Sequence, residues 1–305
     1  MTQPHFDNGI ARLVQLQAAD GVHKLALALH DDAIIECVWL PMPGRSDSGP
    51  RHTLCLSTQV GCRMGCRFCA TATMGLVRNL SAQEICAQVS VIEALFGRPD
   101  NLVFMGMGEA FDNFESWHQA VETLLRSVRQ GSQAPRAYSA KQMTVSTCGY
   151  VPGMLKLCDH HFRKMGVALS LNAARDSLRS ELMPVNRRWP LSTLRETLQR
   201  LPLRHGVFLA EYVVFDGLNH TEEDARALAG WLEGLRACVN LIAYNPTTAI
   251  NPALRAPSPQ TVEDFQARLG QLGVHAKIRA SKGGELQAAC GQLAASTVSK
   301  TKKGE

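Results

Sequence analysis

Hydrophobic and polar residues change their spacing in a regular order from residue 53 onward. Short apolar runs alternate with longer stretches in which apolar residues recur every three or four positions, as in strands followed by amphipathic helices. The strand-like runs are Thr53–Ser57, Asn101–Met105, Gln142–Thr147, Gly166–Leu171, Val207–Phe215, Cys238–Ala243 and Val274–Arg279. The helix-like runs are Ser81–Phe96, Ser116–Gln130, Pro152–His160, Asp176–Met183, Leu191–Leu201, Glu222–Gly234 and Thr261–Leu272. Repeated strand–helix units predict an α/β fold with parallel strands, either an open sheet or a barrel.

The first 50 residues follow a different pattern. Ile10–Ala19 has a weak helical periodicity, whereas Lys24–His30 and Ile34–Leu40 are apolar runs that predict a β-hairpin. A loop rich in Pro, Gly and Ser, Pro41–Pro50, follows the hairpin. We therefore expect a small N-terminal lobe over residues 1–50, a larger domain over residues 51–295, and a disordered basic tail over residues 296–305.

Composition narrows the class of protein. Hydrophobic residues make up 45% of the chain and charged residues 19%, which is typical of a globular protein with a core and excludes wholesale disorder. No apolar run reaches the roughly 20 residues of a membrane span, and the start of the chain lacks the basic and apolar segments of a secretory signal. We expect a cytoplasmic protein, in which the ten cysteines are ligands, reactive thiols or core residues rather than disulfides. The net charge of +5 permits an anionic partner.

The strongest chemical signal is a C-x3-C-x2-C cluster formed by Cys62, Cys66 and Cys69, directly after the first strand of the repeating units. Three thiolates within eight residues can converge on one inorganic centre. A structural zinc ion takes four ligands, and no fourth Cys or His follows at zinc-finger spacing. An iron–sulfur cubane held by three cysteines fits better, because its fourth iron stays open to a small molecule. Zinc and an ordinary cysteine-rich loop are the alternatives.

This spacing, with an aromatic residue before the last cysteine, is the radical S-adenosylmethionine (SAM) signature. The wider sequence is similar to the RlmN/Cfr family of RNA adenine methyltransferases. The similarity runs in order through CLSTQVGCRMGCRFCATATMGLVRNLSAQEI (55–85), FMGMGE (104–109), VSTCGYVPGM (145–154), ALSLNA (168–173), MPVNRRWPL (183–191), EYVVFDGLN (211–219), LIAYNP (241–246) and AACGQLA (288–294). The resemblance implies a partial (β/α)6-type radical SAM barrel with the small N-terminal hairpin lobe.

The resemblance also implies the cofactors and their contacts. A [4Fe-4S] cluster on Cys62, Cys66 and Cys69 would cleave SAM to a 5′-deoxyadenosyl radical. The residues implied to hold SAM lie at the carboxyl ends of the expected strands, where an α/β fold binds its ligands. They are Gly108, Glu109, Ser146, Ser170, Leu171, Asn172 and Asn245.

Three further residues carry the implied methyl transfer. Carbon 2 of adenine is electron-poor and does not attack a sulfonium methyl group, so the family first methylates a protein cysteine. That thiol corresponds to Cys290, and Cys55 corresponds to the thiol that releases the product through a transient disulfide. Glu36 corresponds to the family's proposed proton acceptor, although a solvated strand residue is the alternative and Cys55 is a second candidate base. Buried, unreactive thiols are the alternative for Cys55 and Cys290, and the reading we favour for several of Cys37, Cys86, Cys148, Cys158 and Cys238.

The chain departs from the family in three places. Too few residues precede the hairpin for the usual helical accessory domain, Asn172 stands where the family has histidine, and Ala110 stands where it has proline. We expect RNA, ribosomal or transfer, to be held by basic and aromatic residues. These candidates are Arg63, Arg67, Arg78, Arg187, Arg188, Trp189, Lys300, Lys302 and Lys303.

The expected protein is thus a monomeric RNA methyltransferase that modifies an adenine ring carbon, most simply carbon 2. It would use SAM, a [4Fe-4S] cluster and an electron donor such as flavodoxin or ferredoxin. The alternatives are a radical SAM enzyme with a non-RNA substrate and a non-catalytic iron–sulfur or zinc protein.

Overall fold

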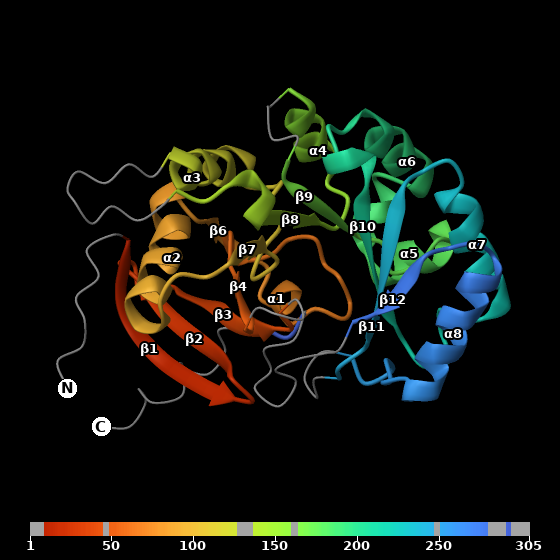
Figure 1. Cartoon of the computed structure of the whole chain (residues 1–305), viewed down its shortest axis with the longest axis horizontal. Coiled ribbons are helices and arrows are strands. Elements are labelled where there is room, and N and C mark those ends of the chain that lie inside the picture. The colour runs from red at the N-terminus through yellow and green to blue at the C-terminus, as the bar shows by residue number, and fades with distance from the viewer. Residues whose placement is uncertain are drawn as a thin grey trace.

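The computed structural model describes residues 9–44, 49–126, 137–159, 164–246, 251–279 and 291–293. Its main sheet has ten strands in the order β1-β2-β3-β4-β7-β8-β9-β10-β11-β12 (Figure 1). Their bounds are β1 Ile10–Ala19, β2 Val22–Leu29, β3 Ile34–Met42, β4 Arg51–Cys55, β7 Asn101–Phe104, β8 Met143–Thr147, β9 Gly166–Ser170, β10 Phe208–Val214, β11 Ala237–Ala243 and β12 Ala276–Ile278. Strands β5 (Gln59–Gly61) and β6 (Leu76–Asn79) form a separate antiparallel hairpin.

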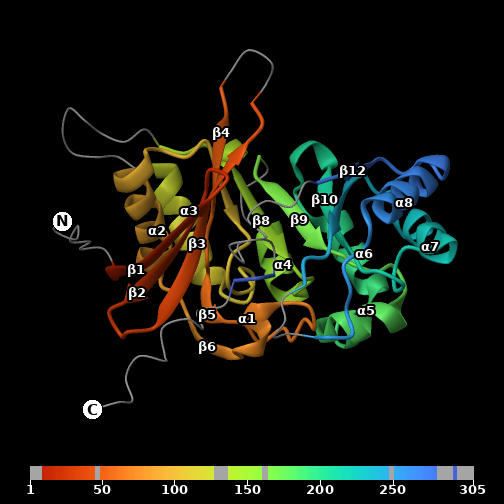
Figure 2. The same ribbon diagram turned by 90° about the horizontal axis from the view of Figure 1, so that it is seen from below.

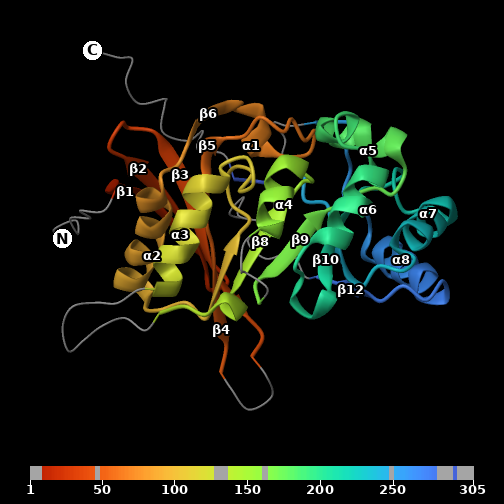
Figure 3. The same ribbon diagram turned by 90° about the horizontal axis from the view of Figure 1, so that it is seen from above.

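Strands β4 and β7 to β12 are parallel to one another, as the alternating pattern predicts. The helices are α1 Ala70–Thr73, α2 Ala82–Phe96, α3 Phe114–Arg126, α4 Val151–Cys158, α5 Asp176–Leu182, α6 Leu191–Arg200, α7 Glu222–Leu232 and α8 Pro259–Gln271. Short 3-10 turns cover Ala140–Gln142, Pro184–Arg187 and Arg204–Gly206. In Figure 3, helices α2, α3, α4 and α6 follow the outer side of the curved sheet. The curved parallel sheet is the expected partial barrel.

The N-terminal strands extend the barrel sheet. Strand β3 pairs antiparallel with β4, so that Val38 lies beside Cys55. The boundary expected after residue 50 therefore does not interrupt the sheet, and residues 296–305 lie outside the described part of the chain.

The helical interpretation of Ile10–Ala19 is wrong, because this segment is strand β1, paired with β2. Two register irregularities, between Ile10 and Arg12 and between Leu13 and Gln15, break the alternation of a regular strand. The apolar residues Ile10, Leu13 and Leu16 consequently recur at three-residue spacing, which imitates a helix.

Capping residues fix where helices begin. Ser81 accepts a hydrogen bond from the Glu84 N–H, and the Glu84 side chain accepts one from the Ser81 N–H, which forms the capping box of α2. Thr221 and Asp224 form the same motif at α7. Each helix between two parallel strands returns the chain from the carboxyl end of one strand to the amino end of the next, so the strands run in the same direction. The carboxyl ends of the parallel strands therefore meet at one end of the barrel.

Candidate functional site

A cavity of about 170 Å³ opens at the carboxyl ends of the parallel strands. The sulfur-bearing residues Cys62, Cys66 and Cys69 line it. The predicted SAM contacts that also line it are Gly108, Glu109, Ser146, Ser170 and Asn172. Figure 2 shows the β5–β6 hairpin and α1, which flank the cysteine loop, at the same end of the molecule as α5. The fold thus brings Cys62 and Asn172, which are 110 positions apart in the sequence, to the same cavity.

Two predicted SAM contacts do not line this cavity. Leu171 is fully buried, and its N–H donates to the carbonyl of Glu211. Asn245 lies beyond the end of β11, where its carbonyl accepts a hydrogen bond from Gln292 Nε2 at 3.4 Å. Asn172 does line the cavity, in the left-handed backbone region with φ 59°. Its side chain already donates to Met183 Sδ and accepts from the Val213 N–H.

Backbone contacts shape the cysteine loop. Gly61 has φ 75°, and a Cβ atom there would lie 1.8 Å from the carbonyl oxygen of Gly75. The adjacent Cys62 N–H donates to that same oxygen at 2.8 Å, and the Arg67 N–H donates to the Leu182 carbonyl at the end of α5. Only glycine permits this close approach of two backbones. The loop is therefore fixed at both the hairpin and α5.

The donor set of the loop fits an iron–sulfur cluster. Burial raises the pKa of the Cys62 thiol to about 12, so a cationic centre is needed to hold its thiolate at neutral pH. Among the described residues, no three Cys, His, Asp or Glu side chains are arranged around a single point as ligands of one metal ion. In a cubane each cysteine binds a different iron. Sulfurs that share a cavity without meeting at one point therefore suit a cluster better than a lone zinc ion.

Glu109 is anchored by the strand next to its own. Its carboxylate accepts hydrogen bonds from the N–H groups of Phe111 at 3.2 Å and Cys148 at 2.8 Å. Burial raises the pKa of this carboxyl, and these hydrogen bonds act in the opposite direction. At the preceding Gly108, φ is 99° and a Cβ atom would lie 2.6 Å from that of Gln59. Glycine is therefore needed at position 108 for close packing against Gln59. The short glycine-rich motif in the sequence did not by itself establish this need.

Of the two reactive-cysteine candidates, the structure describes Cys55. Cys55 is the last residue of β4, is 9% exposed and lines the cavity. Cys290 lies outside the described residues. Gly291 and Leu293, which follow it in the chain, line the cavity. The carbonyl of Gly291 accepts from the Ala70 N–H at 2.7 Å, just after the cysteine loop.

Glu36 is buried rather than solvated, with 2% of its surface exposed, so the solvated alternative is wrong. Its Oε1 lies 3.0 Å from Nζ of Lys24, whose side chain is also buried. Glu36 shares the inner face of β3 with Val38, which pairs with Cys55, and with Leu40, which lines the cavity. Glu36 itself is not among the lining residues.

Several lining residues were not singled out from the sequence as site residues. Cys148 was grouped with unreactive core thiols, yet it lines the cavity, and burial raises its pKa well above the ordinary value. Glu211 and Arg279 form an ion pair of 3.8 Å on the cavity wall, and Asn240 Nδ2 donates to Glu211 at 2.9 Å. A carboxylate in the middle of an apolar strand run was the available signal for Glu211.

The basic residues expected to meet RNA have different surroundings. Arg63 and Arg67 lie within the cysteine loop, with about half of each side chain exposed, and pair with Asp112 and Glu181. Arg78 instead links Asp31 of the β2–β3 turn to Glu84 of α2. Arg187 follows Asn186 in the 3-10 turn after α5, and the Arg188 guanidinium lies over the ring of Trp189, 5.0 Å from its centroid. Lys300, Lys302 and Lys303 lie outside the described residues.

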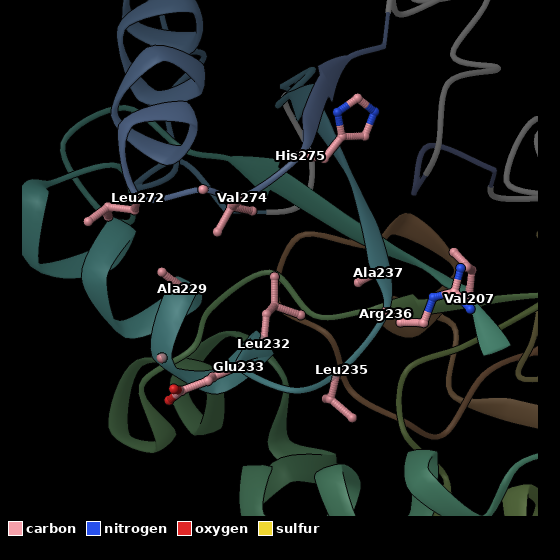
Figure 4. Close-up of a pocket in the computed structure, with 12 residues that line it drawn as sticks. Val207, Ala229, Leu232, Glu233, Leu235, Arg236, Ala237, Leu272, Val274 and His275 are labelled. Atoms are coloured by element: carbon pink, nitrogen blue, oxygen red, sulfur yellow. The ribbon is translucent and has the colours of Figure 1, made fainter.

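A second hollow lies at the opposite end of the parallel strands (Figure 4). This open groove of about 630 Å³ is lined by the starts of β10, β11 and β12 and the ends of α7 and α8. It contains none of the residues predicted to bind SAM, the cluster or RNA, or to take part in catalysis.

In the part of the chain that the structure describes, no helix combines the length and apolar character needed to cross a membrane.

Comparison with known proteins identifies the fold. The family model of the radical SAM superfamily matches residues 56–229. A crystal structure of a radical SAM methyltransferase from Sphaerobacter thermophilus superposes with a TM-score of 0.81 at 37% identity, covering 93% of this chain and 81% of that one. The chain belongs to the radical SAM superfamily.

Curated relatives define the family further. A dual-specificity RNA methyltransferase RlmN from Anaeromyxobacter sp. (strain Fw109-5) is 42% identical over 298 residues, covering 94% of this chain and 74% of the relative. An RlmN from Syntrophobacter fumaroxidans is 40% identical, covering 94% of this chain and 81% of the relative. Within the superfamily, the chain belongs to the RlmN family of methyltransferases. Members of the superfamily use SAM and an iron–sulfur cluster.

Proposed function

We propose that the protein is an RNA methyltransferase that methylates a ring carbon of adenine, and that this carbon is carbon 2. The observation that carries the proposal is the single cavity shared by the cysteine loop, the strand-end polar residues and Cys55. A non-methylating radical enzyme needs no thiol of this kind beside the cluster ligands. The names of the relatives supply RNA as the substrate class.

The residues around the cavity would bind the cluster and SAM. A [4Fe-4S] cluster on Cys62, Cys66 and Cys69 would supply one electron to cleave SAM. Glu109 is held by two N–H donors and keeps lone pairs that can accept from the SAM amino group, and Ser146 and Ser170 offer hydroxyls at neighbouring strand ends. The apolar part of the wall excludes water, which protects a reactive carbon species from side reactions.

Cys290 and Cys55 would carry and release the methyl group. Cys290 would accept a methyl group from SAM, and the radical made from a second SAM would abstract a hydrogen atom from that methyl group. The resulting methylene radical would add to the adenine ring, and the adduct would lose the ring proton and return one electron to the oxidised cluster. Cys55 would then attack the Cys290 sulfur and break its bond to the methylene carbon, which takes up a proton and leaves as the methyl group of the product, while the two cysteines form a disulfide. The position of Cys55 in the cavity and of Gly291 beside Cys69 supports this pairing. The Glu36 side chain is not on the cavity wall, whereas Cys55 lines the cavity. Cys55 is therefore the better placed of the two candidate bases.

Nucleoside analysis tests the proposal directly. Total RNA from a deletion strain should lose one methyladenosine, detected by mass spectrometry and restored by the wild-type gene. Complementation with Cys55→Ala should not restore it, whereas Cys238→Ala, a cysteine outside the cavity wall, should. An unchanged nucleoside profile in the deletion strain would refute an RNA substrate.

A further inference from the structure

Arg179 of α5 is a completely buried cation behind the cavity wall. Its Nε donates to the carbonyl of Leu171 at 3.0 Å, and its Nη2 donates to the carbonyls of Cys148 at 2.8 Å and Ser170 at 3.2 Å. Its Nη1 donates to the side-chain oxygen of Asn186 at 2.7 Å. All four acceptors are neutral.

Among the described residues, Arg179 has no direct ion-pair partner; the carboxylate of Asp176 acts on it only from a greater distance, through Asn186. None of the ion pairs formed by the described residues includes it. Burial lowers the pKa of Arg179 to about 10, and the guanidinium stays protonated at neutral pH. A buried charge is costly unless hydrogen bonds and an opposite charge compensate it. The four neutral acceptors compensate part of the cost for Arg179, and an anionic ligand nearby would compensate the rest.

The missing anion belongs on the cavity side of Arg179. Two of its carbonyl partners are on Cys148 and Ser170, which line the cavity. The guanidinium is also close enough to Cys66 for their charges to interact. An iron–sulfur cluster on three thiolates is an anion, because the thiolates outweigh the positive charge of its oxidised core. Reduction adds a further negative charge.

We propose that Arg179 is the buried counter-cation of the iron–sulfur cluster, a positioning residue that makes reduction of the cluster easier. This inference rests on the cluster assignment made above. The fixed positive charge stabilises the reduced, more negative cluster more than the oxidised one. The same side chain fixes the carbonyls at the ends of β8 and β9, so one residue couples the cluster environment to the strand ends that face SAM.

An exchange of charge between two neighbours tests the electrostatic role without removing the arginine. Asn186 Nδ2 donates to Asp176 Oδ1 at 2.8 Å, so Asp176→Asn combined with Asn186→Asp moves a carboxylate onto Arg179 and leaves the net charge unchanged. Anaerobically reconstituted protein would be titrated with reductant and followed by electron paramagnetic resonance. We expect unchanged iron content and a midpoint potential shifted to more negative values. The single variant Asp176→Asn is the control: it removes the distant carboxylate that acts on Arg179, so its potential should stay at or above the wild-type value rather than shift to more negative values.

Two direct variants separate charge from shape. Arg179→Lys keeps the cation and loses the forked hydrogen bonds, whereas Arg179→Gln keeps amide donors and loses the cation. Arg179→Gln should shift the potential in the same direction as the exchanged pair, and Arg179→Lys should stay near the wild type. Thermal unfolding of the apo proteins identifies any variant that does not fold, and the exchanged pair then decides.

Failure of the counter-cation role can be distinguished from failure of the proposed function. Equal potentials in all folded variants that bind a cluster would overturn the counter-cation role and leave the proposed function intact. Equal shifts in Arg179→Lys and Arg179→Gln would assign Arg179 a purely structural role. A wild-type protein that binds no iron–sulfur cluster after reconstitution would instead refute the proposed function.

Discussion

Nζ of Lys24 lies 3.0 Å from Oε1 of Glu36, and the two side chains are 7% and 2% exposed. They form an ion pair across neighbouring strands β2 and β3, on the face of the sheet that continues into the cavity. A pair this deeply buried is costly to break, since removing one charge deprives the other of its ion-pair partner in a medium of low polarity.

Lys24→Met should therefore lower the free energy of unfolding by about 3–5 kcal/mol. The double variant Lys24→Met with Glu36→Leu should recover most of that loss, because it removes both charges together. Urea denaturation at neutral pH measures the difference. A single variant within about 1 kcal/mol of the wild type would show that other groups satisfy Glu36 without Lys24.

Each cysteine of the loop should be needed for the cluster. Cys62→Ala, Cys66→Ala or Cys69→Ala removes one thiolate from the cavity wall, so anaerobically reconstituted protein should lose its iron, its visible absorbance and its cleavage of SAM. Cys86→Ala is the matched control, since this half-buried thiol of α2 is not on the wall and donates to the Ala120 carbonyl. Full iron content in any loop variant would contradict the ligand assignment.

Cys55 and Cys290 should fail in different ways. Cys290→Ala removes the methyl carrier, so neither methylated protein nor methylated RNA should form. Cys55→Ala keeps the carrier and removes the thiol that releases the product, so RNA should remain covalently attached to Cys290. Denaturing gels before and after nuclease treatment detect that complex. Two variants that are equally inactive and free of attached RNA would favour a generic radical SAM reaction.

Gly61→Ala should destabilise the cysteine loop more than backbone conformation alone requires. Gly217→Ala is the control, because Gly217 also has a positive φ, 68°, but a Cβ atom there meets nothing within 4 Å. The control should cost about 1–2 kcal/mol, the usual penalty for a non-glycine residue in this region. Gly61→Ala adds a collision with the Gly75 carbonyl and should cost more, measured by urea denaturation of both apo proteins. Equal losses would mean that the hairpin can move apart freely.

Periodicity was sufficient to predict the parallel strands and the helices between them, because each of those strands pairs regularly and each helix buries one face. It failed at Ile10–Ala19, where register irregularities changed the spacing of the apolar residues. The loop cysteines were recognisable because their spacing is local. Arg179 and Glu211 were not, because their roles depend on contacts with residues that are distant in the sequence or lie on other strands.

The bond from Thr71 Oγ1 to the carbonyl of Leu293, 2.7 Å long, joins residues 222 positions apart. Together with the contact between Ala70 and Gly291, it attaches the latter part of the chain to the cysteine loop. During synthesis the loop cysteines leave the ribosome long before the residues that complete the wall around them. The cavity is therefore finished only after residue 293 has been made. A cluster delivered to the nascent chain would meet an open loop rather than a closed pocket, so delivery before completion of the chain leaves the metal exposed to solvent and oxidants.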